Sequence, residues 1–565
     1  MNMSQVRHNQ IIAVALFVVS FALLATTAGH YGLTYDEPVY LGLGQRHAQW
    51  FADLWQSIRG GDIVTPFSAP MLDSAWNAGK DQQPPLVKVA SGLGQRWLTW
   101  LLGEWAAMRL PSILLFSIAV AALFLLCAPL WGRIAGLFAA LSLLLMPRGF
   151  AHAHYGALDA SIASLSLLTL FAFLRLAEHD TWRWAVIAGV AFGLALLTKL
   201  NAFFLPIMVI AWAVLCARHM LGKAAVALLI IGPAVFFVGW PWLWHAPVER
   251  FAGYIAFHLR HYPVDVFYLG RTYHYAPWHY PGIVTSVTTP PAALLLAAVG
   301  LANIARVRPE HERQQAVAIL LGIGLGVSLL FSSLPVAPKY NGVRLFLPAL
   351  PLIAGLAGAG FGIVTHYLRA AMARWRGGRF AGRARWLAAA LALMLLLPGL
   401  FAVAATHPHQ LAYYNALVGG PAGAQKKGFE TIYWGGVYLD ALQDFNRLPR
   451  DTTLYITPAG VVSLLVFYQR AGMLREDLRF VSTGETPSDT LNAVVYSDLV
   501  VFQCAQSEFD DVSWPLYRRG RPLMSRMLGP ASLAVPLLNG YTSDAALAVL
   551  KEKRAASDTE GQAAQ

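Results

Sequence analysis

Acidic residues at the ends of apolar segments are the first candidates for chemistry in this sequence. Asp36 and Glu37 directly follow the first long apolar segment, and Asp159 opens a later one. A carboxylate beside a membrane is costly unless it faces water or a partner, so such residues often belong to functional sites. Because adjacent carboxylates repel each other, one of the first two can serve as a proton acceptor. We predict all three as catalytic residues; the alternative for the two aspartates is a role as helix N-caps.

Basic residues interrupt the same apolar pattern. Arg148, Lys199 and Arg344 each lie at the border of an apolar segment. An arginine holds a phosphate with two parallel hydrogen bonds, and a lysine holds it as a point charge. We therefore predict that these three side chains bind an anionic group of a lipid-soluble substrate. The alternative is that their long stems reach from the apolar region to the membrane surface.

Two histidines precede Asp159. His152 and His154 are two residues apart, and together with Glu37 they form the candidate ligand set for a divalent cation. Such a pair is also typical of an ordinary polar loop. The sequence leaves both roles open and predicts no other cofactor.

The composition indicates which elements hold these residues. Of 565 residues, 57% are hydrophobic and only 13% are charged, whereas an ordinary soluble domain has about 25% charged residues. This balance excludes a soluble enzyme and a disordered chain. A bilayer core requires about 20 apolar residues per helix, so we predict a polytopic α-helical membrane protein with about 11 spans. They lie near residues 11–29, 106–128, 133–147, 157–176, 184–199, 202–217, 222–240, 283–305, 316–333, 345–366 and 387–405.

Lysine and arginine predict the orientation of these spans. With the N-terminus in the cytoplasm, most basic residues of the connections fall on the cytoplasmic side. The last of these connections, 366–386, contains a cluster of arginines. This excess explains most of the formal net charge of +12, so the positive charge indicates topology and not nucleic-acid binding.

The opposite side of the membrane receives three larger pieces. Loops at 30–105 and 241–282 belong to the membrane module, residues 1–405, and the second loop is rich in tryptophan and tyrosine. Such aromatic residues form interfacial belts, and sugar-binding surfaces use them as well. Alternating apolar stretches in residues 406–550 predict an extracytoplasmic α/β domain. The polar tail, 551–565, is predicted to be disordered.

Several short motifs occur in an order that resembles a known group of enzymes. They are Asp36-Glu37 after the first span, Gln83-Pro84-Pro85-Leu86, Arg109-Leu110-Pro111, Asp159, Leu196-Leu197-Thr198-Lys199, Trp278-His279-Tyr280-Pro281, Arg344-Leu345-Phe346-Leu347-Pro348 and Tyr433-Trp434-Gly435-Gly436. Together they resemble the polyprenyl-phosphate-dependent glycosyltransferases of the GT-C superfamily, family 39 and its bacterial relatives. These relatives include protein O-mannosyltransferases and lipid A aminoarabinose transferases. Gln83 departs from the pattern, because relatives often carry lysine or histidine before the two prolines.

The resemblance implies a reaction and a location. A sugar linked to a polyprenyl phosphate is the donor, and a hydroxyl of a protein, lipid or glycan is the acceptor, at the outer face of the plasma membrane. It implies that Asp36 is the base, that Glu37 and Asp159 position the acceptor or a metal, and that Lys199, Arg344 and Arg148 hold the donor phosphate. Transfer is expected to invert the anomeric carbon. The alternatives are a transporter, a flippase or a non-catalytic membrane scaffold.

Overall fold

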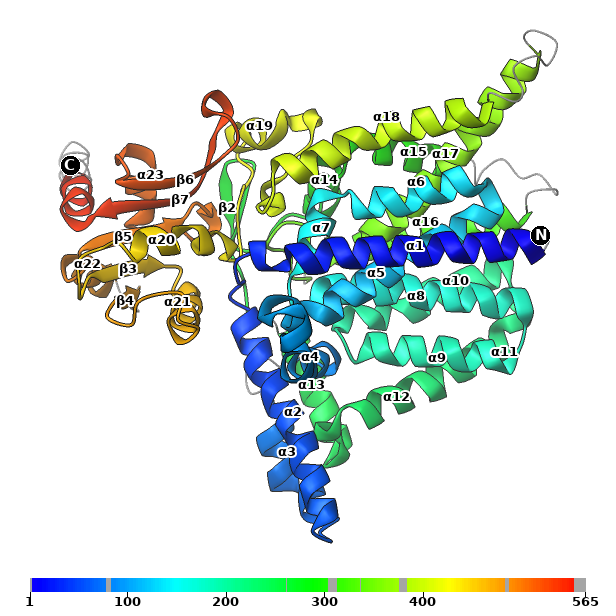
Figure 1. The fold of residues 1–565 in the computed structure, drawn as a ribbon, viewed down its shortest axis with the longest axis horizontal. Coiled ribbons are helices and arrows are strands. Elements are labelled where there is room, and N and C mark those ends of the chain that lie inside the picture. The colour runs from blue at the N-terminus through cyan, green and yellow to red at the C-terminus, as the bar shows by residue number, and fades with distance from the viewer. Residues whose placement is uncertain are drawn as a thin grey trace.

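The computed structural model describes residues 3–77, 83–260, 262–302, 312–335, 337–374, 384–482 and 487–552. Parts of the predicted basic connections, 303–311 and 375–383, and most of the predicted tail, 553–565, lie outside the described residues. Figure 1 shows a bundle of long helices with a smaller domain at one end and the N-terminus at the other. The bundle helices are α1 (Met3–Thr27), α5 (Glu104–Trp131), α6 (Arg133–Leu144), α7 (Pro147–His154), α8 (Leu158–His179), α9 (Trp182–Leu196), α10 (Leu205–Cys216), α11 (Leu221–Val226), α12 (Gly232–Gly239), α14 (Tyr280–Thr288), α15 (Pro291–Ala302), α16 (Glu312–Ser333), α17 (Ala349–Arg374) and α18 (Ala384–Ala405).

The predicted membrane class is confirmed, but two predicted spans are bent. Among the described residues, 7 helices are long and apolar enough to cross a membrane, or up to 9 if each bent pair is one span. The helices α6 and α7 meet at 63° and α14 and α15 at 120°, so the predicted span 133–147 ends at a bend and the predicted span 283–305 is bent within its length. Proline explains both bends, because Pro147 begins α7, and Pro290 directly precedes α15, which begins at Pro291. Proline cannot donate the helical hydrogen bond.

Two further predicted spans, 184–199 and 202–217, are short. Helix α9 has 15 residues and α10 has 12. At about 1.5 Å per residue, each α-helix alone is shorter than a hydrocarbon core of about 30 Å. The chain leaves the α-helix at Leu197 and resumes a helical path only at Leu200. This break places Lys199 at the end of the bundle that also holds α7 and the start of α8.

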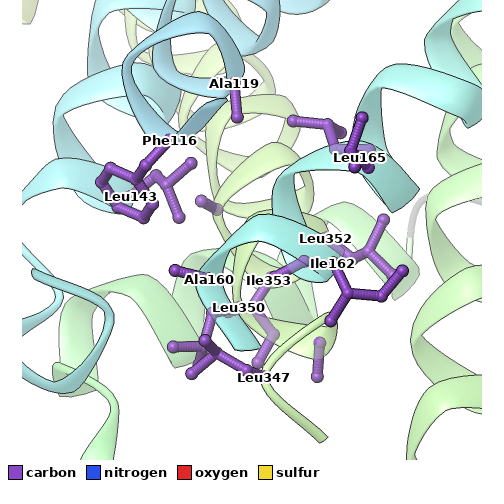
Figure 2. Close-up of a cluster of buried hydrophobic side chains, with 14 of the residues drawn as sticks. Phe116, Ala119, Leu143, Ala160, Ile162, Leu165, Leu347, Leu350, Leu352 and Ile353 are labelled. Atoms are coloured by element: carbon purple, nitrogen blue, oxygen red, sulfur yellow. The ribbon is translucent and has the colours of Figure 1, made fainter. Parts of the chain in front are cut away.

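The interior of the bundle is packed with aliphatic and small side chains. Figure 2 shows Phe116 of α5, Leu143 of α6, Ile162 of α8 and Leu350 of α17 within one cluster of buried side chains. Each of these side chains is buried. This core fixes the ends of α5, α8 and α17, and the polar residues discussed below lie at those ends.

Helices replace much of the predicted outer loop 30–105. These helices are α2 (Glu37–Arg59), α3 (Ala69–Trp76) and α4 (Leu86–Leu102), and α13 (Pro247–Leu259) from the second outer loop joins them. Figure 1 shows α2 running across the end of the bundle, roughly perpendicular to α1. Trp55, Trp97 and Trp100 on α2 and α4 are exposed, as expected for helices that lie at a membrane interface.

The C-terminal domain contains a mixed five-stranded sheet, which fits the predicted α/β class. Its order is β4-β3-β5-β7-β6; β3 pairs in parallel with β4 and β5, and β7 pairs antiparallel with β5 and β6. Helix α21 covers one face and α23 covers the other. The bounds are β3 (Thr453–Thr457), α21 (Gly460–Arg470), β4 (Arg479–Ser482), α22 (Pro487–Val495), β5 (Leu499–Gln503), α23 (Ser513–Arg519), β6 (Met524–Leu528) and β7 (Val535–Thr542), after the short helices α19 (Gly420–Lys426) and α20 (Leu442–Phe445).

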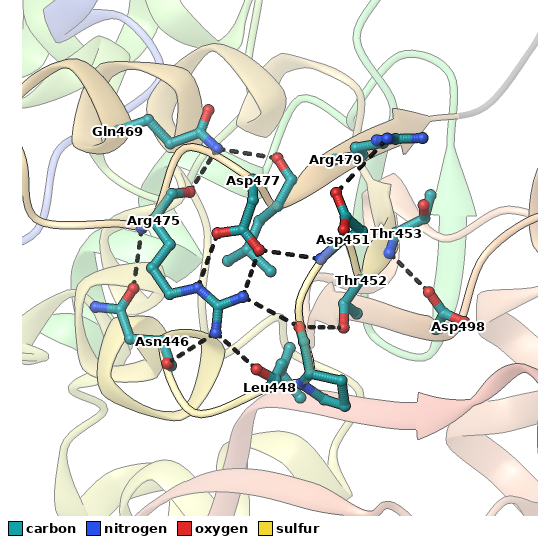
Figure 3. Close-up of polar contacts among 12 residues, drawn as sticks. Asn446, Leu448, Asp451, Thr452, Thr453, Gln469, Arg475, Asp477, Arg479 and Asp498 are labelled. Carbon is teal, nitrogen blue, oxygen red and sulfur yellow. Dashed lines mark hydrogen bonds and ion pairs between the residues drawn. The ribbon is translucent and has the colours of Figure 1, made fainter.

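One arginine joins the loops at the edge of this sheet. In Figure 3, Arg475 donates hydrogen bonds to the carbonyl groups of Asn446 and Leu448 and forms an ion pair with Asp477. This arginine holds the pKa of Asp477 well below its usual value. The loop that follows α20 is therefore fixed to the loop that precedes β4.

Candidate active site

Glu37 lies in a closed set of hydrogen bonds. Arg109 of α5 donates from Nε to Oε1 at 2.8 Å and from Nη2 to Oε2 at 2.9 Å. The backbone N–H groups of Gly156 and Thr34 bind the same two oxygens at 2.7 and 2.9 Å. Arg109 also donates to three carbonyl groups just after α1. Glu37 and Arg109 thus fasten α1, α2 and α5 together, and the sequence did not predict this pair.

The other predicted residues form a chain of alternating charges. Arg344 pairs with Asp36 through Nη2 and with Asp159 through Nε, the latter at 3.1 Å. Lys199 pairs with the second oxygen of Asp159 at 2.5 Å. Four residues from four separate parts of the sequence therefore meet at one end of the bundle, as predicted. Unlike the prediction, the cations contact the carboxylates directly, so the two charge signs neutralise each other.

The three carboxylates differ in exposure. The side chain of Asp36 is 23% exposed, whereas those of Asp159 and Glu37 are each 1% exposed. Asp36 lies at the N-terminus of α2 but makes no capping hydrogen bond with its side chain. Asp159 lies inside the first turn of α8, where Ala157 is the N-cap. Neither aspartate fits the alternative role of an N-cap, and only Asp36 is accessible to an incoming molecule.

Trp434 covers this charge chain from the C-terminal side. Its indole N–H donates to Asp36 at 3.1 Å, and the guanidinium carbon of Arg344 lies 4.3 Å from the centroid of its ring. Trp434 is fully buried and has a φ of 79°, a conformation that is rare for a bulky residue and occurs mainly where the surroundings impose it. A backbone hydrogen bond from Tyr35 to the Trp434 carbonyl holds the loop against the bundle.

A second polar network fixes the C-terminal domain beside Asp36. Tyr35 donates its hydroxyl to Glu508 at 2.8 Å, and Gln503 pairs with the other oxygen of Glu508. Gln503 also accepts a hydrogen bond from the N–H of Gly435, next to Trp434. Burial raises the pKa of Glu508 above its ordinary value. The motif around Trp434 was visible in the sequence, but its contact with Asp36 was not.

Arg148 is buried with part of its hydrogen-bonding capacity unused. Its Nε donates to the carbonyl of Tyr413 at 3.2 Å, and its guanidinium carbon lies 4.7 Å from the centroid of the Tyr414 ring. Within the described part of the chain, Nη1 and Nη2 have no hydrogen-bond partner although both are buried. Arg148 therefore differs from Lys199 and Arg344, whose charged groups are already paired with carboxylates.

The predicted metal ligands do not come together. Both Glu37 oxygens are occupied by the contacts described above, and His154 is hydrogen-bonded to Thr27 and to the carbonyl of Phe150. His152 approaches the hydroxyl of Tyr433 at 3.4 Å. Among the residues described, no group of three or more His, Cys, Asp and Glu side chains could hold a metal ion. The set Glu37, His152 and His154 therefore does not fit a divalent cation.

Lys88 is a basic residue near the site that the sequence prediction missed. It lies in α4, is buried, and donates to the carbonyl of Gln83 at 2.8 Å. Its ammonium nitrogen is 5.5 Å from the centroid of the Tyr40 ring, on the same face of α2 as Asp36. The only sequence signal was a lysine three residues after Pro84-Pro85.

Comparisons with known proteins agree with the predicted resemblance. Residues 95–245 match the family model described as dolichyl-phosphate-mannose-protein mannosyltransferase. ArnT from Cupriavidus metallidurans in the apo state has a TM-score of 0.50 and 17% identity, covering 94% of this chain and 98% of that one. No curated protein matches the sequence.

Two other solved structures are similar to a lesser degree. ArnT from the same organism bound to undecaprenyl phosphate has a TM-score of 0.48 and 17% identity, covering 96% of this chain and 98% of that one. AglB from Archaeoglobus fulgidus, an oligosaccharyltransferase in complex with an inhibitory peptide and a dolichol-phosphate, has a TM-score of 0.44 and 11% identity, covering 87% and 69%. The resemblance to the GT-C glycosyltransferases is therefore confirmed: residues 95–245 match their mannosyltransferase family model, and the chain has the fold of ArnT.

Proposed function

We propose that this protein is a membrane glycosyltransferase that moves a sugar from a polyprenyl phosphate to an acceptor hydroxyl at the outer face of the plasma membrane. The observation that carries the proposal is the accessible carboxylate of Asp36 within an otherwise buried, paired chain of charges. The family match and the ArnT fold support the same reaction class. Hexosyl or pentosyl transfer with inversion is the form of the reaction that we propose.

In this mechanism Asp36 is the base. Its carboxylate takes the proton of the acceptor hydroxyl while that oxygen attacks the anomeric carbon and the bond from this carbon to the phosphate oxygen breaks. The bonding electrons leave with the polyprenyl phosphate. A single displacement of this kind inverts the anomeric carbon. Asp159 and Glu37 are positioning residues, because burial and their pairs with Lys199 and Arg109 separate them from any acceptor.

Arg344 links the base to the donor phosphate. In the described structure it divides its N–H groups between Asp36 and Asp159. A phosphate that competes for Arg344 would loosen its pair with Asp36, so that arrival of the donor frees the base. Arg148 adds two nitrogens without hydrogen-bond partners, Nη1 and Nη2, within the described residues, and such preorganised donors stabilise the charge that develops on a leaving phosphate. Lys199 holds Asp159 against Arg344 and acts on the donor phosphate through that pair.

Substitution of Asp36 tests the proposal. A strain that lacks the protein is complemented with the parent chain, Asp36→Asn or Asp62→Asn, and its envelope glycans and lipids are analysed by mass spectrometry. Asp62 is an exposed carboxylate of the same outer region, so its variant is the matched control. We expect the parent and the control to restore one sugar-sized mass difference. Asp36→Asn should lower the restored amount about 100- to 10,000-fold if the general base is lost.

A second measurement separates the alternatives. Native mass spectrometry of the purified variants with undecaprenyl phosphate reports binding of the lipid without transfer. Unchanged lipid binding by Asp36→Asn, together with loss of the modification, supports an enzyme. Full restoration by Asp36→Asn would remove the residue from the role of base. A deletion strain with no missing sugar would contradict the transferase and favour a transporter, a flippase or a scaffold.

A further inference from the structure

A separate cavity lies outside the bundle, between the second outer loop and the C-terminal domain. Its volume is about 520 Å³, within the range of ligand-binding pockets. One wall is the hairpin of β1 (Val266–Tyr268) and β2 (Arg271–Tyr273), which contributes Phe267 and Thr272, and the other wall is α23 with Asp511, two residues before it. None of its lining residues belongs to the charge chain of Asp36.

Two arginines of α23 give this cavity a positive charge. Arg518 and Arg519 are exposed, and neither has an acidic partner within the described ranges of the chain. The guanidinium carbon of Arg518 lies 4.8 Å from the centroid of the Trp514 ring. Stacking of this kind orients the planar guanidinium and leaves its edge free for a carboxylate or a phosphate. Asp511 adds one carboxylate to the lining.

Aromatic side chains form the apolar part of the wall. The ring centroids of Trp514 and Phe267 are 5.7 Å apart, so the two walls meet there, and Phe509 packs against Trp514 at 5.1 Å. Thr272 adds a hydroxyl on the hairpin side. A surface with apolar ring edges, hydroxyl and carboxylate groups and two cations matches a sugar ring, which has C–H faces, hydroxyl groups and, in acidic sugars, a negative charge.

The cavity is connected to the active site by rigid contacts. Tyr517 of α23 accepts hydrogen bonds from Gln425 at 2.7 Å and from Gln506 at 3.3 Å. Gln506 begins the short turn that ends at Glu508, the partner of Tyr35 beside Asp36. On the other wall, the N–H of Gly270 donates to the carbonyl of Gly428 at 3.0 Å. Hydrogen bonds therefore link α23, which lines the cavity, through the turn that contains Gln506 and Glu508 to Tyr35 beside Asp36.

We propose that this cavity binds an anionic saccharide of the acceptor molecule and so holds the acceptor beside the active site. This assignment rests on the proposed glycosyltransferase function. The donor phosphate is not the occupant that we propose for this cavity, because Arg344 and Arg148 at the end of the bundle are assigned to it. The shared chemistry is a sugar ring with a carboxylate or a phosphate, and the two kinds of acidic sugar are distinguished in the experiment.

Direct binding to the full-length protein in nanodiscs tests this site without any donor or transfer. The probes are trigalacturonate, mannose 6-phosphate, the neutral sugar maltotriose and inorganic phosphate, measured by calorimetry. The variant Arg518→Gln with Arg519→Gln removes both charges. Arg470→Gln is the matched control, since Arg470 is an exposed arginine at the end of α21 on the opposite face of the sheet.

We expect trigalacturonate or mannose 6-phosphate to bind the parent protein. The probe that binds should have the same affinity for the Arg470→Gln control as for the parent. The double variant should bind at least about tenfold more weakly, as expected for the loss of charged hydrogen bonds. The stronger of the two probes identifies a uronic or a phosphorylated acceptor. Equal binding of maltotriose would overturn the anionic assignment, and equal binding of inorganic phosphate would overturn the saccharide assignment. Binding that the double variant retains would overturn the site, whereas failure of the transferase proposal would appear only in the complementation experiment.

Discussion

Asp36 and Glu37 are adjacent and have the same charge, and their different surroundings separate their roles. Glu37 receives hydrogen bonds from Arg109 and from two backbone N–H groups, so its oxygens have no capacity left for a substrate. Asp36 receives its hydrogen bonds at one oxygen, from Arg344 and Trp434. Its other oxygen has no hydrogen-bond partner within the described residues. A proton acceptor requires such an open position.

Substitution of Trp434 is expected to reduce turnover without abolishing it. Trp434→Phe removes the N–H that binds Asp36 and retains part of the aromatic surface under Arg344. A lost hydrogen bond to a charged group costs about 1.5–3 kcal/mol, so we expect a fall of about 10- to 100-fold in initial rate. The rate is measured with the donor sugar that mass spectrometry identifies. Trp212→Phe is the control, because it loses one indole hydrogen bond inside the bundle, to the carbonyl of Ala316. Equal rate losses in both variants would contradict a positioning role for Trp434.

Glu430 is expected to make stability depend on pH. Burial raises the pKa of Glu430 to about 8, although hydrogen bonds from Ser507 oppose this shift. In the folded protein Glu430 keeps its proton up to about pH 8, whereas in the unfolded chain it loses the proton above its ordinary value of 4.5. Its contribution to stability is therefore complete below pH 4.5 and is lost as the pH rises toward 8.

The substitution Glu430→Gln should remove this dependence. We expect the melting temperature of the variant, relative to the parent, to increase from pH 5 to pH 8.5, measured by intrinsic fluorescence of the full-length protein in detergent. Glu476→Gln, at an exposed carboxylate of the same domain, should change nothing over this range. If the difference in melting temperature between Glu430→Gln and the parent were the same at all pH values, Glu430 would be ionised in the folded state.

The residue types of the site were predictable from sequence, but their pairing was not. Because a charged side chain at the membrane border is energetically costly, the sequence pointed to Asp36, Asp159, Lys199 and Arg344. All four side chains lie together in the structure. Which cation contacts which carboxylate depends on where α2, α8 and the turn before α17 end in space. No local pattern encodes that arrangement, and for this reason Arg109 and Trp434 were seen only as parts of motifs.

At the scale of elements, the lengths of the apolar segments predicted where helices occur. They predicted less well where one helix ends and the next begins. The long uniform segments of α1, α5, α8 and α17 are single helices. The segments near Pro147 and Pro290 contained enough apolar residues for a span, yet proline divides each into two helices at a steep angle. The first of these bends places Arg148 in α7, where its guanidinium lies over the ring of Tyr414.

Close packing of α15 against α17 depends on two glycines. A Cβ on Gly360 would overlap the carbonyl oxygen of Leu296, and one on Gly300 would overlap that of Leu356. Small residues let membrane helices approach in this way. We expect Gly360→Ala to cost about 1–3 kcal/mol, as for overpacked sites, and to lower the melting temperature in detergent. Gly326→Ala on α16 is the control, since its Cβ would meet no atom within 4 Å. A melting temperature that falls equally in both variants would contradict the close-packing argument.

At the scale of the whole molecule, basic residues of several connections lie at the end of the bundle that holds the N-terminus. Arg133 bonds Asn9 of α1, Arg313 pairs with Glu178, and Lys223 pairs with Asp180. These contacts join several connections on one side, and the C-terminal domain lies at the opposite end (Figure 1). The sequence predicted the same segregation of charge from the spacing of lysine and arginine alone.

This segregation leads to a prediction of topology. Lysine and arginine near the ends of spans remain in the cytoplasm, so the end with the N-terminus should be cytoplasmic and the C-terminal domain should be outside. Green fluorescent protein fused after Arg374, at the end of α17, should fluoresce, because the fusion point lies at the basic end of the bundle. The same reporter fused after Leu550 should remain dark, and alkaline phosphatase fused there should be active. Fluorescence from the Leu550 fusion would reverse the orientation and would place Asp36 on the cytoplasmic side, where an acceptor exposed only at the outer face could not reach it.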